Sequence, residues 1–251
     1  MSTVVRDALV VVVVLVLYYR VVLVRVRDRV VAPALVFLLG RFGNPRLPVG
    51  DVENVLTLTF SVFLQILLFF LLGAWTAVKF GKVWRWSGQP QLLAYGAVLG
   101  LGEMVLSSFL GLILIKVSTA FPKIGDPLVH WRVAINSGWM RLFNTTVKLL
   151  PLPAAIGVVV LYVGVEELIV RGIVLNVLLP LGQVAAVVLS TAVFAGYQVF
   201  NLPSWRVALF PVLGALVIGP VHGVLYVRIP DVWPLVVAHV TYFTIVALTY
   251  R

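Results

Sequence analysis

The stretch LLPLPAAIGVVVLYVGVEELIVRGIVLNVLL covers residues 149–179 and points to the class of fold. Its charged residues are Glu166, Glu167 and Arg171, and all three lie inside an otherwise apolar run. A segment of about 20 apolar residues is long enough to cross the hydrocarbon core of a bilayer as a helix. The run therefore predicts a membrane-spanning helix that carries a polar site.

The composition of the whole chain agrees with a membrane protein. Of its 251 residues, 62% are apolar and 11% are charged, and the mean hydropathy is +1.11. A soluble domain carries about 25% charged residues, and it needs polar residues to cover its core. A soluble enzyme and a disordered chain are therefore excluded.

Further apolar runs lie on both sides of this stretch. The other predicted spans are Ala8–Val24, Asn54–Val78, Gln91–Ile115, Val184–Phe200, Val207–Val227 and Val232–Tyr250. Val30–Gly40 is too short to cross alone, so we expect it to be a surface or re-entrant piece. The many β-branched residues still favour helices, because a lipid-exposed strand outside a closed barrel leaves its backbone groups unpaired. The sequence predicts an all-α, polytopic transmembrane bundle of about seven to eight helices.

The net charge of +10 arises from 19 basic and 9 acidic residues. The basic residues flank apolar runs, as in the arginine cluster between Arg20 and Arg29. That placement is typical of anchoring by anionic lipid, and it does not indicate a nucleic-acid partner. We therefore expect contact with membrane lipid and no nucleic acid. We also expect connections 25–46 and 116–148 on the cytoplasmic side of a multi-pass protein in a prokaryotic plasma (inner) membrane.

Two features suggest where a membrane protein partner could dock. Gly96, Gly100 and Gly102 make a small-residue face on one span, and such faces let helices pack closely. The 117–148 connection mixes aromatic and basic residues, which suits an amphipathic element on the membrane surface. Either feature is a candidate docking surface.

Ionisable side chains at membrane depth are functional candidates, because a charge at mid-bilayer costs a few kcal/mol. The candidates are Glu103, Glu166, Glu167, Arg171, His222 and His239, with Asn176, Gln198 and Asn201 as uncharged companions. Glu167 and Arg171 are four residues apart, in the order that favours an ion pair on one helical face. Glu166 is then left without a local partner. Burial disfavours its charged form and makes it a candidate proton acceptor, unless all three groups only hold helices together.

The remaining polar groups are expected to be structural. Glu103 is expected to pair with a basic residue of another helix, and His222, one turn before Tyr226, to be a hydrogen-bonded packing group. Metal binding has weak support, because the chain has no cysteine and no His-Glu-x-x-His motif. We therefore expect no metal and no other cofactor.

Three segments of the C-terminal part form one ordered pattern. Glu166–Arg171 reads E-E-x-x-x-R, Phe194–Gln198 reads F-x-x-x-Q, and Gly223–His239 runs from a Leu-Tyr turn through Trp-Pro to Ala-His. These segments resemble the motifs of the CPBP family, the CAAX-protease and bacteriocin-processing group, also called the Abi family. The resemblance implies a helical bundle around a polar cavity. It also implies a CAAX-protease-like core at 148–251, preceded at 1–147 by transmembrane helices with an amphipathic connection.

The resemblance further implies a role for four residues. Glu166 corresponds to the glutamate that activates a water, and Glu167 and Arg171 correspond to the pair that supports it. His239 corresponds to the histidine of the last motif, which holds an oxyanion together with an Asn or Asp four residues later. These four residues are the candidate catalytic set.

Two positions depart from the family pattern. The histidine of the second motif is Gln198 here, and the residue four after His239 is Phe243. An amide cannot take a proton as an imidazole does, and a phenyl ring donates nothing to an oxyanion. Loss of a general base or its helper typically costs about 10²–10⁴ in rate, and loss of one oxyanion donor about 10² or more. His222 could replace the missing imidazole from a neighbouring helix.

These departures favour a pseudoprotease, a catalytically impaired relative that acts as a binding or accessory membrane subunit. The alternative is a glutamate-dependent intramembrane endopeptidase of the CAAX-processing type, with a variant active site and a peptide or lipidated peptide as substrate. A third possibility is lipid or solute handling through the bundle cavity. The short set of polar residues and the lack of a visible inverted repeat disfavour this third function.

Overall fold

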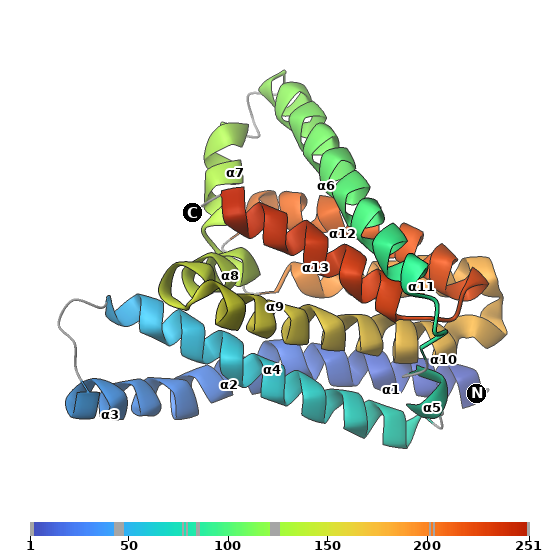
Figure 1. Cartoon of the computed structure of the whole chain (residues 1–251), viewed down its shortest axis with the longest axis horizontal. Coiled ribbons are helices and arrows are strands. Elements are labelled where there is room, and N and C mark those ends of the chain that lie inside the picture. Colours follow the sequence, from blue (N-terminus) through green and yellow to red (C-terminus); the bar gives the residue numbers. More distant parts are fainter. Residues whose placement is uncertain are drawn as a thin grey trace.

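The computed structural model describes residues 3–42, 48–76, 78, 80–83, 86–120, 126–200, 202 and 204–249. Within these residues the chain is helical and has no strand (Figure 1). Among the described residues, four helices are long and apolar enough to cross a membrane, namely Val4–Phe37, Val49–Trp75, Pro90–Val117 and Val207–Arg228. Gln183–Gln198 and Trp233–Ile245 are shorter apolar helices. The prediction of an all-α, integral membrane bundle is thus confirmed.

The N-terminal part is one helical run that contains two π-helical segments. In order, it comprises α1 (Thr3–Leu17), η1 (Tyr18–Val22), α2 (Leu23–Val26), η2 (Arg27–Val31) and α3 (Ala32–Phe42). The expectation that Val30–Gly40 is a separate surface or re-entrant piece is therefore wrong, because these residues continue the first helix. Arg25, Arg27 and Arg29 are exposed on this run. Their long side chains can carry the charge outward without interrupting the helix.

In the middle of the chain, the residues that the structure describes form two long helices and three short ones. They are α4 (Val49–Trp75), α5 (Phe80–Val83), α6 (Pro90–Thr119), α7 (Pro127–Ile135) and α8 (Gly138–Leu149). In α8, Phe143 and Val147 are buried whereas Arg141 and Lys148 are exposed. This helix therefore has the amphipathic character expected within the 117–148 connection.

The C-terminal part begins with the run that the sequence predicted as a span at 149–179. Its elements are α9 (Leu152–Glu167), η4 (Leu168–Leu175), α10 (Asn176–Leu178), η5 (Leu179–Leu181), α11 (Gln183–Gln198), α12 (Trp205–Arg228) and α13 (Trp233–Thr249). In Figure 1, α1 and α13 run in one direction along the long axis, and α4 and α9 run in the opposite direction. The helices thus alternate as in a multi-pass membrane protein.

The helix α6 crosses α13 at its beginning and leans away from the bundle towards its end (Figure 1). A Cβ at Gly96 or Gly100 would collide with the backbone carbonyls of Pro234 and Ala238, so these two glycines let the helices touch. The expectation that this glycine face docks a partner protein is therefore wrong for Gly96 and Gly100, because α13 of the same chain covers them. The division of the chain at residue 147 stays a prediction.

Candidate functional site

The site lies on a helix that widens directly after its two glutamates. α9 ends at Glu167 and continues as the π-helical segment η4. A wider π turn leaves carbonyl groups without their α-helical partners. The side-chain amide of Asn176 donates to the carbonyl oxygens of Arg171 at 3.1 Å and Gly172 at 2.8 Å, and it lies 3.1 Å from the hydroxyl of Tyr226. Asn176, which the sequence marked only as a companion, thus stabilises the local backbone.

Glu167 is the centre of the polar cluster and is fully buried. Its Oε2 lies 3.3 Å from Nε of Arg171, so the ion pair expected from the spacing is present. Its Oε1 is 2.7 Å from Nδ1 of His239 and 3.2 Å from Nδ1 of His222. An ionised carboxylate only accepts, so Nδ1 of His239 is the donor of the shorter contact.

The guanidinium of Arg171 is held on several sides in the core. Besides its pair with Glu167, it donates to the carbonyl oxygen of Ile218 at 3.4 Å. Its planar end lies 4.8 Å from the centre of the Phe194 ring, at a distance suited to a cation–π contact. A buried charge is tolerated when it is paired in this way.

Glu166 has neighbours that come from other helices. Its Oε2 lies 3.8 Å from Nε2 of His239, and the Tyr197 hydroxyl lies near its carboxylate without regular hydrogen-bond geometry. Tyr197 in turn stacks on Tyr19, with ring centres 4.7 Å apart. Glu166 therefore lacks a partner on its own helix, as expected, but it faces α11 and α13. Sequence spacing gave no signal for the two tyrosines, because they come from distant helices.

Glu103 and His222 are part of the same cluster. Oε1 of Glu103 on α6 lies 3.1 Å from Nε2 of His222 on α12, and both side chains are buried. Glu103 thus contacts His222, a residue of another helix that is basic when protonated, which agrees with the expected pairing. The geometry does not place His222 in the role of the missing imidazole, because its ring nitrogens face Glu103 and Glu167 and not Glu166.

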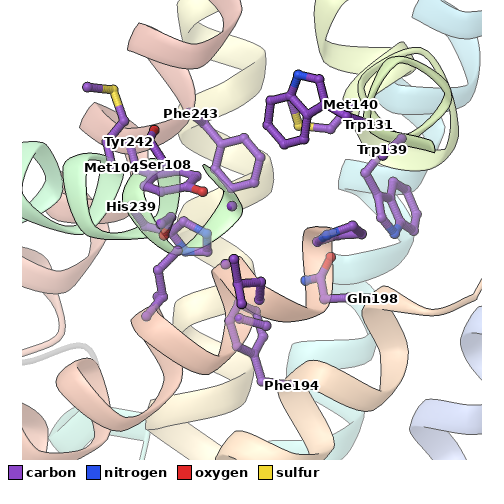
Figure 2. Close-up of a pocket in the computed structure, with 18 of the residues that line it drawn as sticks. Met104, Ser108, Trp131, Trp139, Met140, Phe194, Gln198, His239, Tyr242 and Phe243 are labelled. Carbon is purple, nitrogen blue, oxygen red and sulfur yellow. The ribbon is translucent and has the colours of Figure 1, made fainter. Parts of the chain in front are cut away.

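A cavity of about 270 Å³ lies beside this cluster, between α6, α7, α8, α11, α12 and α13. Most of its large lining side chains are aromatic or contain sulfur, and several are shown in Figure 2: Met104, Trp131, Trp139, Met140, Phe194, Tyr242 and Phe243. Polar groups in the lining come from Ser107, Ser108, Ser137, Gln198 and His239. A mostly apolar cavity with a few polar groups is suited to an apolar ligand segment.

Gln198 and Phe243, the two positions that depart from the family pattern, line this cavity together with His239 (Figure 2). The rings of Phe243 and His239 are 5.0 Å apart, and Phe194 meets His239 edge-on at 5.9 Å. Glu166 is not among the described residues that line the cavity. His239, which lies 3.8 Å from Glu166, does line the cavity, and it contacts the rings of Phe194 and Phe243 there.

Asn201 and a metal site were the remaining features considered from the sequence. Asn201 lies outside the residues that the structure describes, so its place relative to the cluster stays a prediction. Among the described residues, no group of three or more His, Cys, Asp or Glu side chains is arranged to hold a metal ion.

The structure thus has a buried cluster of glutamates and histidines beside a cavity, inside a bundle of apolar helices. Residues 148–245 match the family described as Type II CAAX prenyl endopeptidase Rce1-like. This segment is therefore similar to the CAAX-protease group of the CPBP family, and the resemblance inferred from the three motifs is confirmed. Comparison with curated proteins gave no match, and neither did comparison with solved structures.

Proposed function

We propose that the protein is a catalytically impaired CPBP-family member that binds an apolar or lipidated peptide segment as an accessory subunit in the membrane. The observation that carries this proposal is the joint presence of Gln198 and Phe243 in the cavity wall beside His239. At these two positions the family pattern has an imidazole that assists water activation and a donor that holds the oxyanion. Gln198 cannot take up a proton and Phe243 cannot donate a hydrogen bond, so neither residue supplies the function of its position.

The chemistry of the two residues supports impaired hydrolysis. Gln198 can hydrogen-bond to a ligand, but it cannot take up a proton. Phe243 has no donor, and its ring centre lies 5.0 Å from that of His239. Loss of one oxyanion donor alone typically lowers kcat by about 10²–10³. Because such losses are not additive, even the smaller figure leaves a slow enzyme.

Restoring the two motif positions tests the proposal directly. The native protein, Gln198→His with Phe243→Asn, and the same pair with Glu166→Ala are purified in lipid nanodiscs and given farnesylated CAAX peptides. We expect cleavage only by the doubly restored protein, and its loss when Glu166 is also replaced. Cleavage by the native protein that disappears in Glu166→Ala would overturn the proposal.

Ligand binding has its own test, which uses two glycines of α6. Gly111 lines the cavity and has no atom within 4 Å of a Cβ placed there, so Gly111→Leu fills the space without a clash at Cβ. Gly102, equally free of neighbours, is exposed on the same helix, and Gly102→Leu is the matched control. We expect Gly111→Leu to weaken binding of a fluorescent farnesylated peptide at least about tenfold. Equal binding by both variants would contradict a role for the cavity.

The second candidate function is a working intramembrane endopeptidase with a variant site. It is favoured by the assembly of Glu166, Glu167, Arg171 and His239 into one buried cluster. In that case Glu166→Ala should change the pattern of membrane peptides in cells that carry the protein. Quantitative peptide profiling that finds no difference between Glu166→Ala and the native protein would dismiss this alternative.

A further inference from the structure

The central carboxylate of Glu167 is shared by two imidazoles that are arranged in the same way. His239 turns Nδ1 to Oε1 of Glu167 at 2.7 Å and Nε2 to Glu166 at 3.8 Å. His222 turns Nδ1 to the same Oε1 at 3.2 Å and Nε2 to Glu103 at 3.1 Å. The two rings are 6.0 Å apart and nearly perpendicular. The cluster therefore has two acid–imidazole pairs, Glu166 with His239 and Glu103 with His222, and both imidazoles contact Glu167.

The charges of the cluster require additional protons on the two acid–imidazole pairs. In the described part of the chain, the cluster contains three carboxylates, from Glu103, Glu166 and Glu167, and one guanidinium, from Arg171, which pairs with Glu167. An unbalanced charge in an apolar interior costs several kcal/mol, so the cluster is expected to be neutral as a whole. Neutrality is reached when two protons are bound in addition to the Nδ1 protons that face Glu167. Each Nε2–carboxylate contact provides a place for one of them.

We propose that Glu103 and His222 form a second acid–imidazole dyad, which holds one proton and positions Glu167 and, through it, His239. Neither residue is among those that line the cavity in the described part of the chain, so both are positioning residues. Glu103 lies on α6, outside the segment 148–245 that matches the CAAX-protease family. The dyad does not depend on whether the protein cleaves a peptide.

The contacts around His222 distinguish this role from simple packing. Its ring is fully buried, and neither of its nitrogens makes a regular hydrogen bond. The titratable groups that face it are Glu103 from α6, Glu167 from α9 and His239 from α13. A neutral imidazole has one nitrogen that only accepts, and that nitrogen would face a carboxylate oxygen without a proton between them. A shared proton removes this repulsion.

Nitrogen NMR of the histidine rings tests the dyad. The chain contains three histidines, and His130 on α7 lies outside the cluster and serves as the internal reference. In ¹⁵N-histidine-labelled protein in nanodiscs near neutral pH, we expect both ring nitrogens of native His222 to have signals of protonated or proton-sharing nitrogens. In Glu103→Gln, we expect Nε2 of His222 to become unprotonated and the signals of His239 to shift as well. Glu53→Gln on α4 is the matched control, in which neither histidine should change.

Three outcomes would overturn the proposal. Unchanged His222 signals in Glu103→Gln would show that Glu103 shares no proton with it. A shift confined to His222 would show that the dyad does not position His239. If Glu103→Gln does not accumulate in the membrane, His222→Gln is measured instead, because glutamine hydrogen-bonds but holds no proton. Unchanged His239 signals in His222→Gln would then reject the positioning role.

Discussion

Glu167 and Arg171 form the residue pair on which the buried cluster depends. Both side chains are buried, and the carboxylate of Glu167 also contacts the imidazoles of His222 and His239. A paired buried charge is tolerated, whereas one left alone by a mutation is strongly destabilising. Substitutions at the pair should therefore affect stability as well as the site.

Replacing Arg171 tests this dependence. We expect Arg171→Met to lower the free energy of unfolding by about 3–5 kcal/mol, because the Glu167 carboxylate loses its guanidinium in the core. Reversible unfolding in mixed micelles gives the value. Asp7→Asn, which breaks the exposed pair of Arg6 and Asp7, is the control and should have little effect. Adding Glu167→Gln to Arg171→Met should restore part of the lost free energy of unfolding. A further decrease would show that the unpaired Glu167 charge is not the cause.

The sequence predicted the local part of the site better than the distant part. The pair of Glu167 and Arg171 follows from helical spacing, and the motif pattern identified His239. In contrast, the contact of Glu103 with His222 joins α6 to α12, and Tyr19 reaches Tyr197 from the first helix. Such contacts depend on how helices pack, which the spacing of residues along one helix does not specify.

At the scale of elements, η4 gives the site helix an irregular turn that Asn176 holds in place. We expect Asn176→Leu to remove the donor for two backbone carbonyls and to lower the free energy of unfolding by about 1–3 kcal/mol. Hydrogen exchange of the amides of 168–176 should become faster. Asn54→Leu, which removes a contact between α4 and Thr145 of α8, is the control. Slow exchange of 168–176 in both variants would show that η4 does not need Asn176.

The contact of α6 with α13 is the second element that can be tested. A side chain at Gly100 meets the carbonyl oxygen of Ala238, so we expect Gly100→Val to force the helices apart and to lower stability by about 1–3 kcal/mol or more. Gly102→Val, on the exposed face of the same helix, should be close to neutral. Thermal unfolding of both variants in detergent gives the comparison. Equal melting temperatures would contradict the close packing.

Hydropathy located the four helices of the described residues that are long and apolar enough to cross a membrane, because the bilayer requires long apolar helices. Hydropathy did not show that Val30–Gly40 continues the first helix. The length of a single apolar run does not reveal whether the helix extends into it from the preceding run. The face of Gly96 and Gly100 was recognised as a packing surface. The sequence could not show that this face packs against α13 of the same chain and not against another protein, because a small-residue face fits any closely approaching helix.

At the scale of the whole molecule, the alternating helices predict which ends of the bundle face which side of the membrane. The starts of α4 and α11 lie at opposite ends of the long axis (Figure 1), and these helices begin at Val49 and Gln183. The native chain has no cysteine, so single Val49→Cys and Gln183→Cys variants can be labelled without background. With the basic connections in the cytoplasm, an impermeant maleimide on intact cells should label only Gln183→Cys. Labelling of both variants would contradict the alternation.

The first helical run also relates the protein to the thickness of its bilayer. Val4–Phe37 comprises 34 residues, a length of about 51 Å at 1.5 Å per residue, whereas a hydrocarbon core measures about 30 Å. The arginines from Arg25 to Arg29 begin about 31 Å along this run, close to the far boundary of such a core. A thicker bilayer would draw these guanidinium groups into hydrocarbon, and a thinner one would expose valines to water. The tilt of this helix is therefore expected to change with the chain length of the lipids. The stacking contact of Tyr19, which lies on this helix, is expected to change with it.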